Sequence, residues 1–419
     1  MNLRDFRRAG HGPTLLCAFL YFDISFMIWV MVGALANSIV DTFSLSPLEK
    51  GFLVAVPILG GAVLRLVLGL LTDQIGARRT ALIGMVLTVL PLVLGWLWAD
   101  SFGKVLLVGL LLGVAGASFA AALPLASRWY PPQYQGLALG IAGAGNSGTA
   151  LATFFGPRLA VSLGWHTIFG LALVPLGLVL VLFACLAKDS PNQPPPKRFA
   201  DYVAVLRLRD TWRLCLFYSV TFGGFVGLAS YLNIFFHKHY DLSPVQAGTL
   251  VTLCVFAGSF LRPLGGYLAD RIGGISLLTM LYVAVGVLLL DQATSPPMVW
   301  GVIVFVITMG LFGLGNGAVF QLVPQRFPKE IGVVTGIVGA AGGVGGFFLP
   351  TLLGGMEQLT GGVGSGFFLL ALAPIGCVVV LVGMSKVWEG VFVTRGGLAP
   401  VRQEAATGPV RRPELAGSN

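Results

Sequence analysis

Runs of about 20 apolar residues follow one another along almost the whole chain, and short polar turns separate them. A run of this length can cross a bilayer as an α-helix. The strict alternation of apolar and polar residues that marks a membrane β-strand is absent. The pattern therefore predicts an all-α membrane protein. Its twelve expected spans lie at residues 14–38, 48–71, 79–99, 104–127, 133–156, 166–187, 212–236, 245–268, 275–292, 298–322, 331–355 and 365–387.

One long polar connection divides these spans into two groups of six. It runs from Lys188 to Asp210 and contains the segment SPNQPPPKR, which cannot continue a helix. The residues after Trp388 are polar and rich in Gly, Pro and Arg, a composition typical of disorder. The expected organisation is an N-terminal segment over 1–13, a six-helix bundle over 14–187, a linker over 188–211, a second six-helix bundle over 212–387 and a disordered tail over 388–419.

The two groups of spans repeat one another at a nearly constant offset. Four residues of the first group recur 197 positions later: Arg65, Gly69, Asp73 and Gly76 as Arg262, Gly266, Asp270 and Gly273. Two glycines recur 196 positions later: Gly136 and Gly140 as Gly332 and Gly336. A parallel repeat of this kind, with a site at the midplane between its halves, is an architecture of membrane transporters.

The charged residues sort by side of the membrane. Only 10% of the 419 residues are charged, against about 25% in a soluble protein. Two of the 26 lysines and arginines lie inside spans, and most others lie in loops that share a side with the N-terminus. The opposite side holds only Lys50, Lys104, Arg158 and Lys238. The positive-inside rule then places both termini, the linker and the tail in the cytoplasm, in a multi-pass protein of the inner membrane.

Composition also limits the partners and cofactors. We attribute the net charge of +9 to the basic loops that orient the protein in the membrane and that also attract the anionic lipids of the bilayer. We do not take it as a sign of nucleic-acid binding. The five cysteines stand singly, with no metal-binding spacing, so we expect neither a metal nor a cofactor. No cleavable signal peptide, nucleophile–base pair or phosphate loop is found, so an enzyme is not expected.

The two basic residues inside spans, Arg65 and Arg262, are the main candidates for chemistry. An arginine at membrane depth costs roughly 2.5–3.5 kcal/mol, so it is expected to face the protein interior. The repeat directs both side chains to one central cavity, where they repel each other unless an anion lies between them. The alternative is a structural pair neutralised by buried carboxylates. Asp23 is the only acidic residue clearly inside a span, and one carboxylate cannot neutralise two arginines.

Glycine dominates the fifth and the eleventh expected spans. The fifth reads GLALGIAGAGNSGTA and the eleventh reads GVVTGIVGAAGGVGGFFLP. Small residues at this spacing allow helices to pack closely, which is the simpler interpretation. They also allow a small ligand to approach the backbone. Asn146 needs hydrogen-bond partners in a dry span, so it is expected either to donate to an anion or to bond between helices.

Two loops carry a family resemblance. GLLTDQIGARR after the second span and GYLADRIGG after the eighth resemble the signature loop of the major facilitator superfamily, over residues 14 to 390. The second copy departs from the pattern, because no basic pair follows Gly273 and Gly274. The resemblance implies twelve helices in two pseudo-symmetric six-helix bundles. We expect a gating role for residues of these loops and of the glycine-rich spans, namely Asp73, Arg78, Arg79, Asp270, Arg271, Gly136, Gly140, Gly332 and Gly336.

The glycine segments resemble the paired signatures of the nitrate/nitrite porter family within that superfamily. The residues that carry this match are Gly136 to Gly148, with Gly143, Gly145 and Asn146, and Gly332 to Pro350, with Gly339, Gly342, Gly343, Gly345 and Gly346. The arginine-bearing segments GAVLR and FLRPLGG also resemble that family. The resemblance implies alternating-access transport of nitrate and nitrite, with the planar anion held between the two arginines. Aromatic residues implied at the site are Phe26, Phe119, Phe222 and Tyr218.

The sequence allows two ways of driving transport, proton symport and nitrate/nitrite exchange. Asp23 is a candidate for carrying a proton, which would make the protein a proton symporter. A cavity poor in carboxylates favours nitrate/nitrite exchange instead. The rival functions are a carrier of another small anion, such as an organic monocarboxylate or a phosphate ester, and a membrane sensor without transport. The protein is expected to be a monomer.

Overall fold

The computed structural model describes residues 6, 8–191, 199–327 and 330–400, and helices make up nearly all of them. The first half of the chain contains α2 (Gly12–Trp29), α3 (Met31–Ala34), α4 (Ala36–Phe43), α5 (Pro47–Ile75), α6 (Ala77–Leu97), α7 (Phe102–Gly116), α8 (Phe119–Ser127), α9 (Pro132–Gly143), the 3₁₀ turn η1 (Ala144–Ser147), α10 (Gly148–Leu163) and α11 (Trp165–Leu186). The second half contains α12 (Phe199–Leu206), α13 (Arg209–His239), α14 (Pro244–Ile272), α15 (Gly274–Ala293), α16 (Met298–Arg326), α17 (Ile331–Thr360), α18 (Gly364–Trp388) and η2 (Arg395–Gly397).

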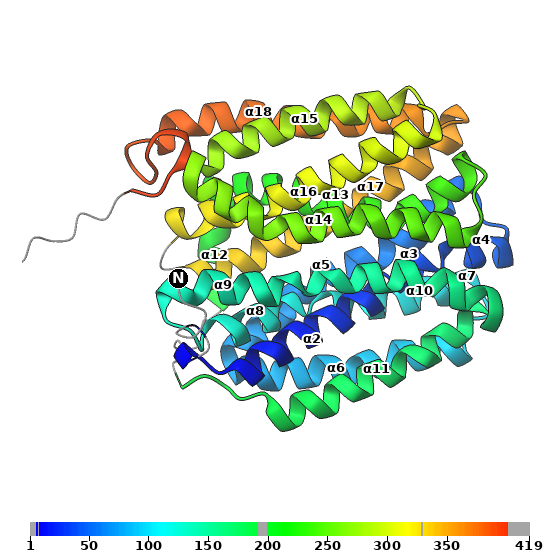
Figure 1. Cartoon of the computed structure of the whole chain (residues 1–419), viewed down its shortest axis with the longest axis horizontal. Coiled ribbons are helices and arrows are strands. Elements are labelled where there is room, and N and C mark those ends of the chain that lie inside the picture. The colour runs from blue at the N-terminus through cyan, green and yellow to red at the C-terminus, as the bar shows by residue number, and fades with distance from the viewer. Residues whose placement is uncertain (1–5, 7, 192–198, 328–329, 401–419) are drawn as a thin grey trace, which may run out of the picture.

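The long helices lie side by side and form two bundles, α2–α11 and α13–α18 (Figure 1). In the described part of the chain, eleven helical segments are long and apolar enough to cross a membrane. The remaining expected span, 133–156, is interrupted by η1 and so falls into α9 and α10. The predicted all-α fold is therefore confirmed. The first expected span is also interrupted, between α2, α3 and α4, and the fourth between α7 and α8.

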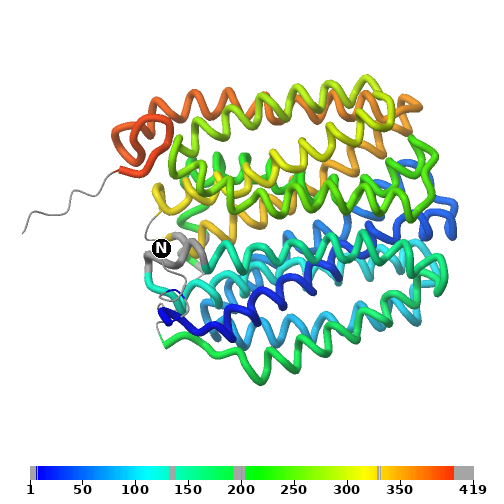
Figure 2. The backbone as a smooth tube through the Cα atoms, in the orientation of Figure 1, coloured from blue at the N-terminus to red at the C-terminus, as the bar shows by residue number. Residues whose placement is uncertain are grey.

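The start of α2 and the end of α18 lie at the same end of the molecule, called the termini end below (Figure 2). The opposite end, called the far end, holds α4 and the turn before α5. Several helices are longer than the apolar runs that predicted them. For example, α13 begins at Arg209 and α16 ends at Arg326. Backbone hydrogen bonding continues past the apolar core into residues whose polar side chains can reach water, so hydropathy alone underestimates helix length.

Helices α5 and α14 are equivalent from one end to the other, which sets the depth of the site. Both are 29 residues long, and both begin with a serine capping box followed by proline, at Ser46 and Ser243. Both end at a glycine with a backbone φ of 92°, Gly76 and Gly273. Residues other than glycine rarely adopt this backbone conformation. Arg65 and Arg262 therefore occupy the same position in two matching helices.

The two bundles meet mainly along two seams, α5 with α17 and α10 with α14, and α13 also contacts α3, α4 and α5. Glycines bring the first seam close. A Cβ atom at Gly354 would lie 2.4 Å from the Pro47 carbonyl oxygen at the far end, and one at Gly343 would lie 2.7 Å from the Ala62 side chain near the middle. At the termini end, by contrast, a Cβ at Gly332 would have no atom within 4 Å. The bundles are thus packed together at the far end.

Residues 389–400 fold back over the termini end of the second bundle and are called the strap. Val393 is buried, and Phe392 lies under the Arg326 guanidinium, 4.1 Å from the ring centroid. A Cβ at Gly273 would lie 2.0 Å from the Gly396 carbonyl oxygen, so the strap packs directly on the loop that lacks a basic pair. The sequence placed these residues in a disordered tail because their composition is polar. Residues 401–419 of that predicted tail lie outside the described residues.

Prediction for helix packing. Gly113 of α7 lies so close to α5 that an added Cβ would be 2.1 Å from the carbonyl carbon of Gly60. Gly113→Ala should therefore force the two helices apart and destabilise the protein by about 1–3 kcal/mol, as overpacking does. Thermal unfolding in detergent should show a clearly lower midpoint. The control is Gly177→Ala in α11, where the new methyl group meets no atom within 4 Å. An unchanged midpoint for Gly113→Ala would contradict the close packing described.

Candidate functional site

Arg65 and Arg262 lie in the middle of the molecule, one from each bundle. Only 2% of the Arg65 surface is exposed, and Arg262 is partly buried. A buried guanidinium must find hydrogen-bond acceptors or aromatic faces, because it cannot lose its charge in a protein. Their surroundings therefore define the site.

Arg65 is held by backbone carbonyl groups and not by a carboxylate. Its Nε donates to the Gly116 carbonyl oxygen at 3.0 Å, at the end of α7 in the same bundle. Its Nη1 donates to the Gly339 carbonyl oxygen at 2.7 Å, on α17 of the other bundle. Its Nη2 has no hydrogen-bond partner among the described residues. Arg65 thus joins the two bundles and retains one unused donor group.

Arg262 has fewer contacts. Its Nη2 donates to the Tyr218 hydroxyl at 3.3 Å, and its Nη1 has no partner within the described part of the chain. Tyr218 stacks on Phe222 with ring centroids 5.1 Å apart and an angle of 6° between the planes. Gly342 makes room for this stack, since a Cβ there would lie 2.5 Å from the Tyr218 ring.

Aromatic rings surround both guanidinium groups. The Arg65 Cζ lies 4.8 Å from the Phe222 ring centroid and 5.1 Å from that of Trp29. The Phe119 ring is shared, at 5.8 Å from Arg65 Cζ and 5.7 Å from Arg262 Cζ. Each contact is within the range of a cation–π interaction. The two cations therefore face one phenylalanine, which lies at the start of α8.

Three further side chains belong to this region, and they are not among the site residues predicted from the sequence. Trp29 covers Arg65, and Phe320 of α16 lies 6.0 Å from Arg262 Cζ and 4.9 Å from the Tyr218 ring centroid. Asn316 lies one helical turn before Phe320 on the same face, fully buried, and its amide atoms have no partner among the described residues. An amide within the apolar run GLFGLGNGAVF was the one visible signal for it.

Phe26 lies behind the ring cluster and not against an arginine. It is fully buried and packs on Trp29 and Phe22, with centroids 5.0 and 4.4 Å away. It therefore supports Trp29, which in turn lies on Arg65.

The glycine-rich turn η1 brings Asn146 to the interface with α14. Asn146 is 1% exposed, and both atoms of its amide group lack partners within the described residues. Gly145 packs against Phe22, where a Cβ would lie 2.8 Å from the ring, while Gly143 has open space beside it. The turn therefore carries an unsatisfied amide into the protein interior.

Asp23 faces η1 and not an arginine. The Ser147 hydroxyl donates to its Oδ1 at 2.7 Å, and the Gly148 backbone also hydrogen-bonds to it. The ion pairs found in the described part of the chain do not include Asp23. This carboxyl group links the middle of α2 to the break in the fifth span.

The residues expected to gate the cytoplasmic side contact their own bundle. Arg128 pairs with Asp73 at 2.9 Å, and Arg78 donates to the Ala187 and Ala184 carbonyl oxygens at the end of α11. Further along, Arg79, Asp270 and Arg271 are exposed, and Arg271 lies over the Tyr267 ring. These contacts brace each loop, and a gating role for them stays a prediction.

The glycines of the fifth and eleventh spans that are expected to have a gating role lie at the termini end. Gly140 and Gly332 both have open space where a Cβ would be. Gly336 is partly buried, and for Gly136 only the backbone of α9 is described. No tight contact between the bundles is found at Gly140 or Gly332, in contrast to the far end.

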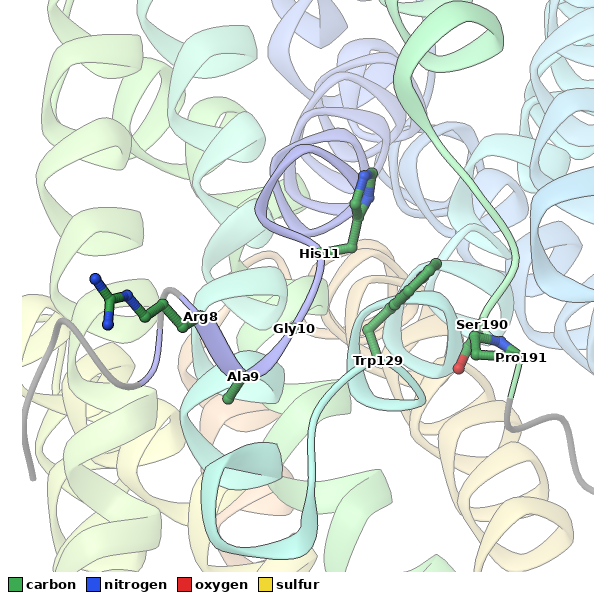
Figure 3. Close-up of a pocket in the computed structure, with 7 residues that line it drawn as sticks. All are labelled: Arg8, Ala9, Gly10, His11, Trp129, Ser190 and Pro191. Carbon is green, nitrogen blue, oxygen red and sulfur yellow. The ribbon is translucent and has the colours of Figure 1, made fainter.

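A separate pocket of about 350 Å³ lies at the termini end, and neither Arg65 nor Arg262 lines it (Figure 3). The Trp129 indole donates to the Lys188 carbonyl oxygen and lies against the His11 ring there. Arg8 points away from both rings (Figure 3). The pocket is lined by Arg8, Ala9, Gly10, His11, Trp129, Ser190 and Pro191. It is a surface hollow, and the candidate functional site remains the arginine pair.

The chemistry available at the arginine pair is binding. Two cations from opposite bundles present unused N–H groups inside a shell of aromatic rings. No cluster of three or more metal-ligating side chains is found among the described residues. Such a site suits a small planar anion, because guanidinium forks match flat oxyanions and ring faces pack on either side of them.

Comparisons with known proteins agree on one superfamily. A family model of the Major Facilitator Superfamily matches residues 15–350. The chain is 36% identical over 354 residues to a probable nitrate/nitrite transporter of Mycobacterium tuberculosis, covering 82% of this chain and 89% of that protein. It is 33% identical over 363 residues to a nitrite extrusion protein of Bacillus subtilis, covering 86% and 91%.

Solved structures share the fold. The xylose transporter of E. coli in a partially occluded inward-open conformation matches with a TM-score of 0.70 at 15% identity. The match covers 88% of this chain and 97% of that chain. Similarity at this level of identity concerns the architecture alone.

Proposed function

The chain belongs to the nitrate/nitrite porter family of the Major Facilitator Superfamily, and on that premise we propose that it carries nitrate and nitrite across the inner membrane by alternating access. The observation that carries the proposal is the arginine pair. Arg65 and Arg262 come from equivalent positions of the two bundles and face the shared ring of Phe119. Each keeps one guanidinium nitrogen that has no partner among the described residues.

The chemistry of the site favours a flat, weakly hydrated monoanion. An ion held between the two guanidinium groups would accept hydrogen bonds from Arg65 Nη2 and Arg262 Nη1 and would offset the repulsion between the cations. Neighbouring rings exclude water, which strengthens these charge-assisted bonds. The amides of Asn146 and Asn316 offer neutral donors nearby. Nitrate and nitrite meet these requirements because they are planar and carry a single charge.

The packing of the bundles supports alternating access. They touch along α5–α17 and α10–α14, with the closest glycine contacts at the far end. If both termini are cytoplasmic, as the basic residues of their loops indicate, the structure is closed on the extracellular side. Binding of the anion would draw Arg65 and Arg262 together and allow the termini end to close while the far end opens. The glycine faces of α9 and α17 would then form the new contact.

For the coupling, we propose that Asp23 carries a proton in symport with nitrate. This carboxyl group is buried, is hydrogen-bonded to Ser147 at the helix break, and belongs to the bundle that holds Arg65. A rearrangement of η1 as the bundles rock would change the hydrogen bonds that Asp23 receives. Its proton affinity could thereby be linked to the side on which the site is open.

Prediction for the arginine pair. Arg65→Lys and Arg262→Lys should each lower nitrate uptake into proteoliposomes at least tenfold. A lysine keeps the charge but not the fork, and losing one charge-assisted hydrogen bond costs about 1.5–3 kcal/mol. The control is Arg207→Lys, an exposed arginine outside the spans. Near-normal uptake by either site variant, at equal amounts of inserted protein, would contradict the proposal. Nitrite should compete with nitrate in the wild type, and acetate and phosphate esters should not.

Prediction for alternating access. The hydroxyl oxygens of Thr153 on α10 and Thr252 on α14 lie 2.8 Å apart across the second seam. Replacing both by cysteine, in a background with the five native cysteines changed to alanine, should allow a disulfide that holds the far end closed. Oxidation should abolish uptake, and a reducing agent should restore it. Each single-cysteine variant should be insensitive to oxidation. Full transport by completely cross-linked protein would exclude opening at this seam.

Prediction for the proton. Wild-type uptake should rise when a pH gradient is imposed with its acidic side on the side of uptake. Asp23→Asn should lose that stimulation, because an amide cannot accept and release the proton, yet should retain exchange of internal nitrite for external nitrate. Liposomes loaded with or without nitrite, with and without a gradient, separate the two modes. Stimulation by internal nitrite alone in the wild type would reject the role of Asp23 and identify the protein as an exchanger.

A further inference from the structure

We propose that Asn37 and Asn233 form a reciprocal clasp that holds the far end closed and must open in every transport cycle. Both side chains are buried, at 3% and 1% exposure, although neither lies at the arginine pair. They belong to different bundles, Asn37 to α4 and Asn233 to α13.

Each asparagine donates its amide to the backbone of the opposite bundle. Asn37 Nδ2 donates to the Asn233 carbonyl oxygen at 3.1 Å. Asn233 Nδ2 donates to the Ala34 carbonyl oxygen at 2.7 Å, with a weaker contact to that of Gly33 at 3.4 Å. These hydrogen bonds cross between bundles at buried side chains, and leaving a buried amide without a partner costs free energy.

A break in the first span supplies the acceptors. The helix is interrupted at Val30 and again at Leu35, so α3 is only four residues long. The last carbonyl groups of a helix have no partner within it. Gly33 and Ala34 stand at that position, and their carbonyl oxygens are the ones that accept from Asn233. An uninterrupted helix would have used them for its own hydrogen bonds.

The clasp lies on the symmetry axis of the repeat. Asn37 and Asn233 differ by 196 positions, as do Phe26 and Phe222. Gly33 and Ser230 differ by 197 and also touch, because a Cβ on Gly33 would lie 2.9 Å from the Ser230 Cα. Equivalent residues of two halves meet each other only near the axis that relates them. The arginine pair is related by the same axis, so the clasp lies directly on the path between the site and the far end.

Distance along the helices places the clasp well beyond the site. Asn37 follows Phe26, and Asn233 follows Phe222, by eleven residues in each case. In the uninterrupted helix α13, at 1.5 Å per residue, this corresponds to roughly 16 Å. An ion that moves from the far end to the two arginines can therefore pass only when the hydrogen bonds of the clasp are broken. This inference rests on the proposed alternating access, but it concerns a contact that binds no substrate.

The test measures opening of the far end without measuring transport. Thr153 is 1% exposed within the α10–α14 seam, so a cysteine there reacts with a membrane-impermeant maleimide only when the far end opens. In a background with the native cysteines replaced, the labelling rate of Thr153→Cys from the far side reports the open population. Asn37→Ala and Asn233→Ala should each raise this rate about threefold, and the double variant about tenfold, as expected for independent interhelical hydrogen bonds in a membrane.

Two controls accompany the measurement. Gln292 is buried and donates to the Gly301 carbonyl oxygen within the second bundle, so Gln292→Leu removes a similar amide bond without touching the seam. It should leave the rate unchanged. A cysteine at exposed Ser162 should label equally in every variant, which checks folding and access of the reagent. If an alanine variant fails to fold, Asn37→Ser and Asn233→Ser, whose hydroxyls are too short to reach across, take its place.

Labelling of Thr153→Cys at the parental rate in the clasp variants would overturn the inference. So would an equal increase with Gln292→Leu, since the effect would then be general loosening. These results are separate from the proposed function. Failure of nitrate uptake together with faster labelling would reject the substrate and keep the clasp, whereas normal uptake with unchanged labelling would reject the clasp and keep the transporter.

Discussion

Burying two guanidinium groups in the middle of an apolar molecule sets conditions that the surrounding helices must meet. Neither charge can be lost by deprotonation, and no carboxylate is found paired with either arginine among the described residues. Arg65 instead donates to the Gly116 and Gly339 carbonyl oxygens and lies against ring faces. Backbone groups can reach a side chain in this way only where helices end or approach closely. The end of α7 and the close approach of the glycine-rich α17 to α5 provide these two carbonyl groups.

The two halves of the molecule are similar in the helices that carry the buried arginines and different in the contacts that these arginines make. Helices α5 and α14 match from their capping boxes to their terminal glycines, so the two arginines reach the same depth. Their hydrogen bonds differ, since Arg65 donates to carbonyl groups of both bundles while Arg262 donates to the Tyr218 hydroxyl in its own bundle. The two halves are thus alike in the depth of their arginines and unlike in how each arginine is held.

Much of this architecture could be predicted from the sequence, and the failures have physical causes. Apolar runs and the 197-residue repeat indicated the helices, the two halves and the arginine pair, because each rests on many residues or on a costly charge. Trp29 and Phe320 escaped prediction because one aromatic residue among 29 phenylalanines and eight tryptophans carries no local sign of its partner. The strap escaped because its polar composition resembles that of a disordered tail, and its order depends on contacts with distant residues such as Gly273 and Arg326.

The strap has a consequence for how the protein is made. Residues 389–400 follow α18 in the order of synthesis, so the loop at Gly273 stays uncovered until the strap has been made. The equivalent loop of the first bundle is instead braced by Arg78 against the end of α11, which is made before the second bundle. A chain that stops at Trp388 would contain all eleven described helical segments that are long enough to cross a membrane, and would still lack the segment that covers this loop.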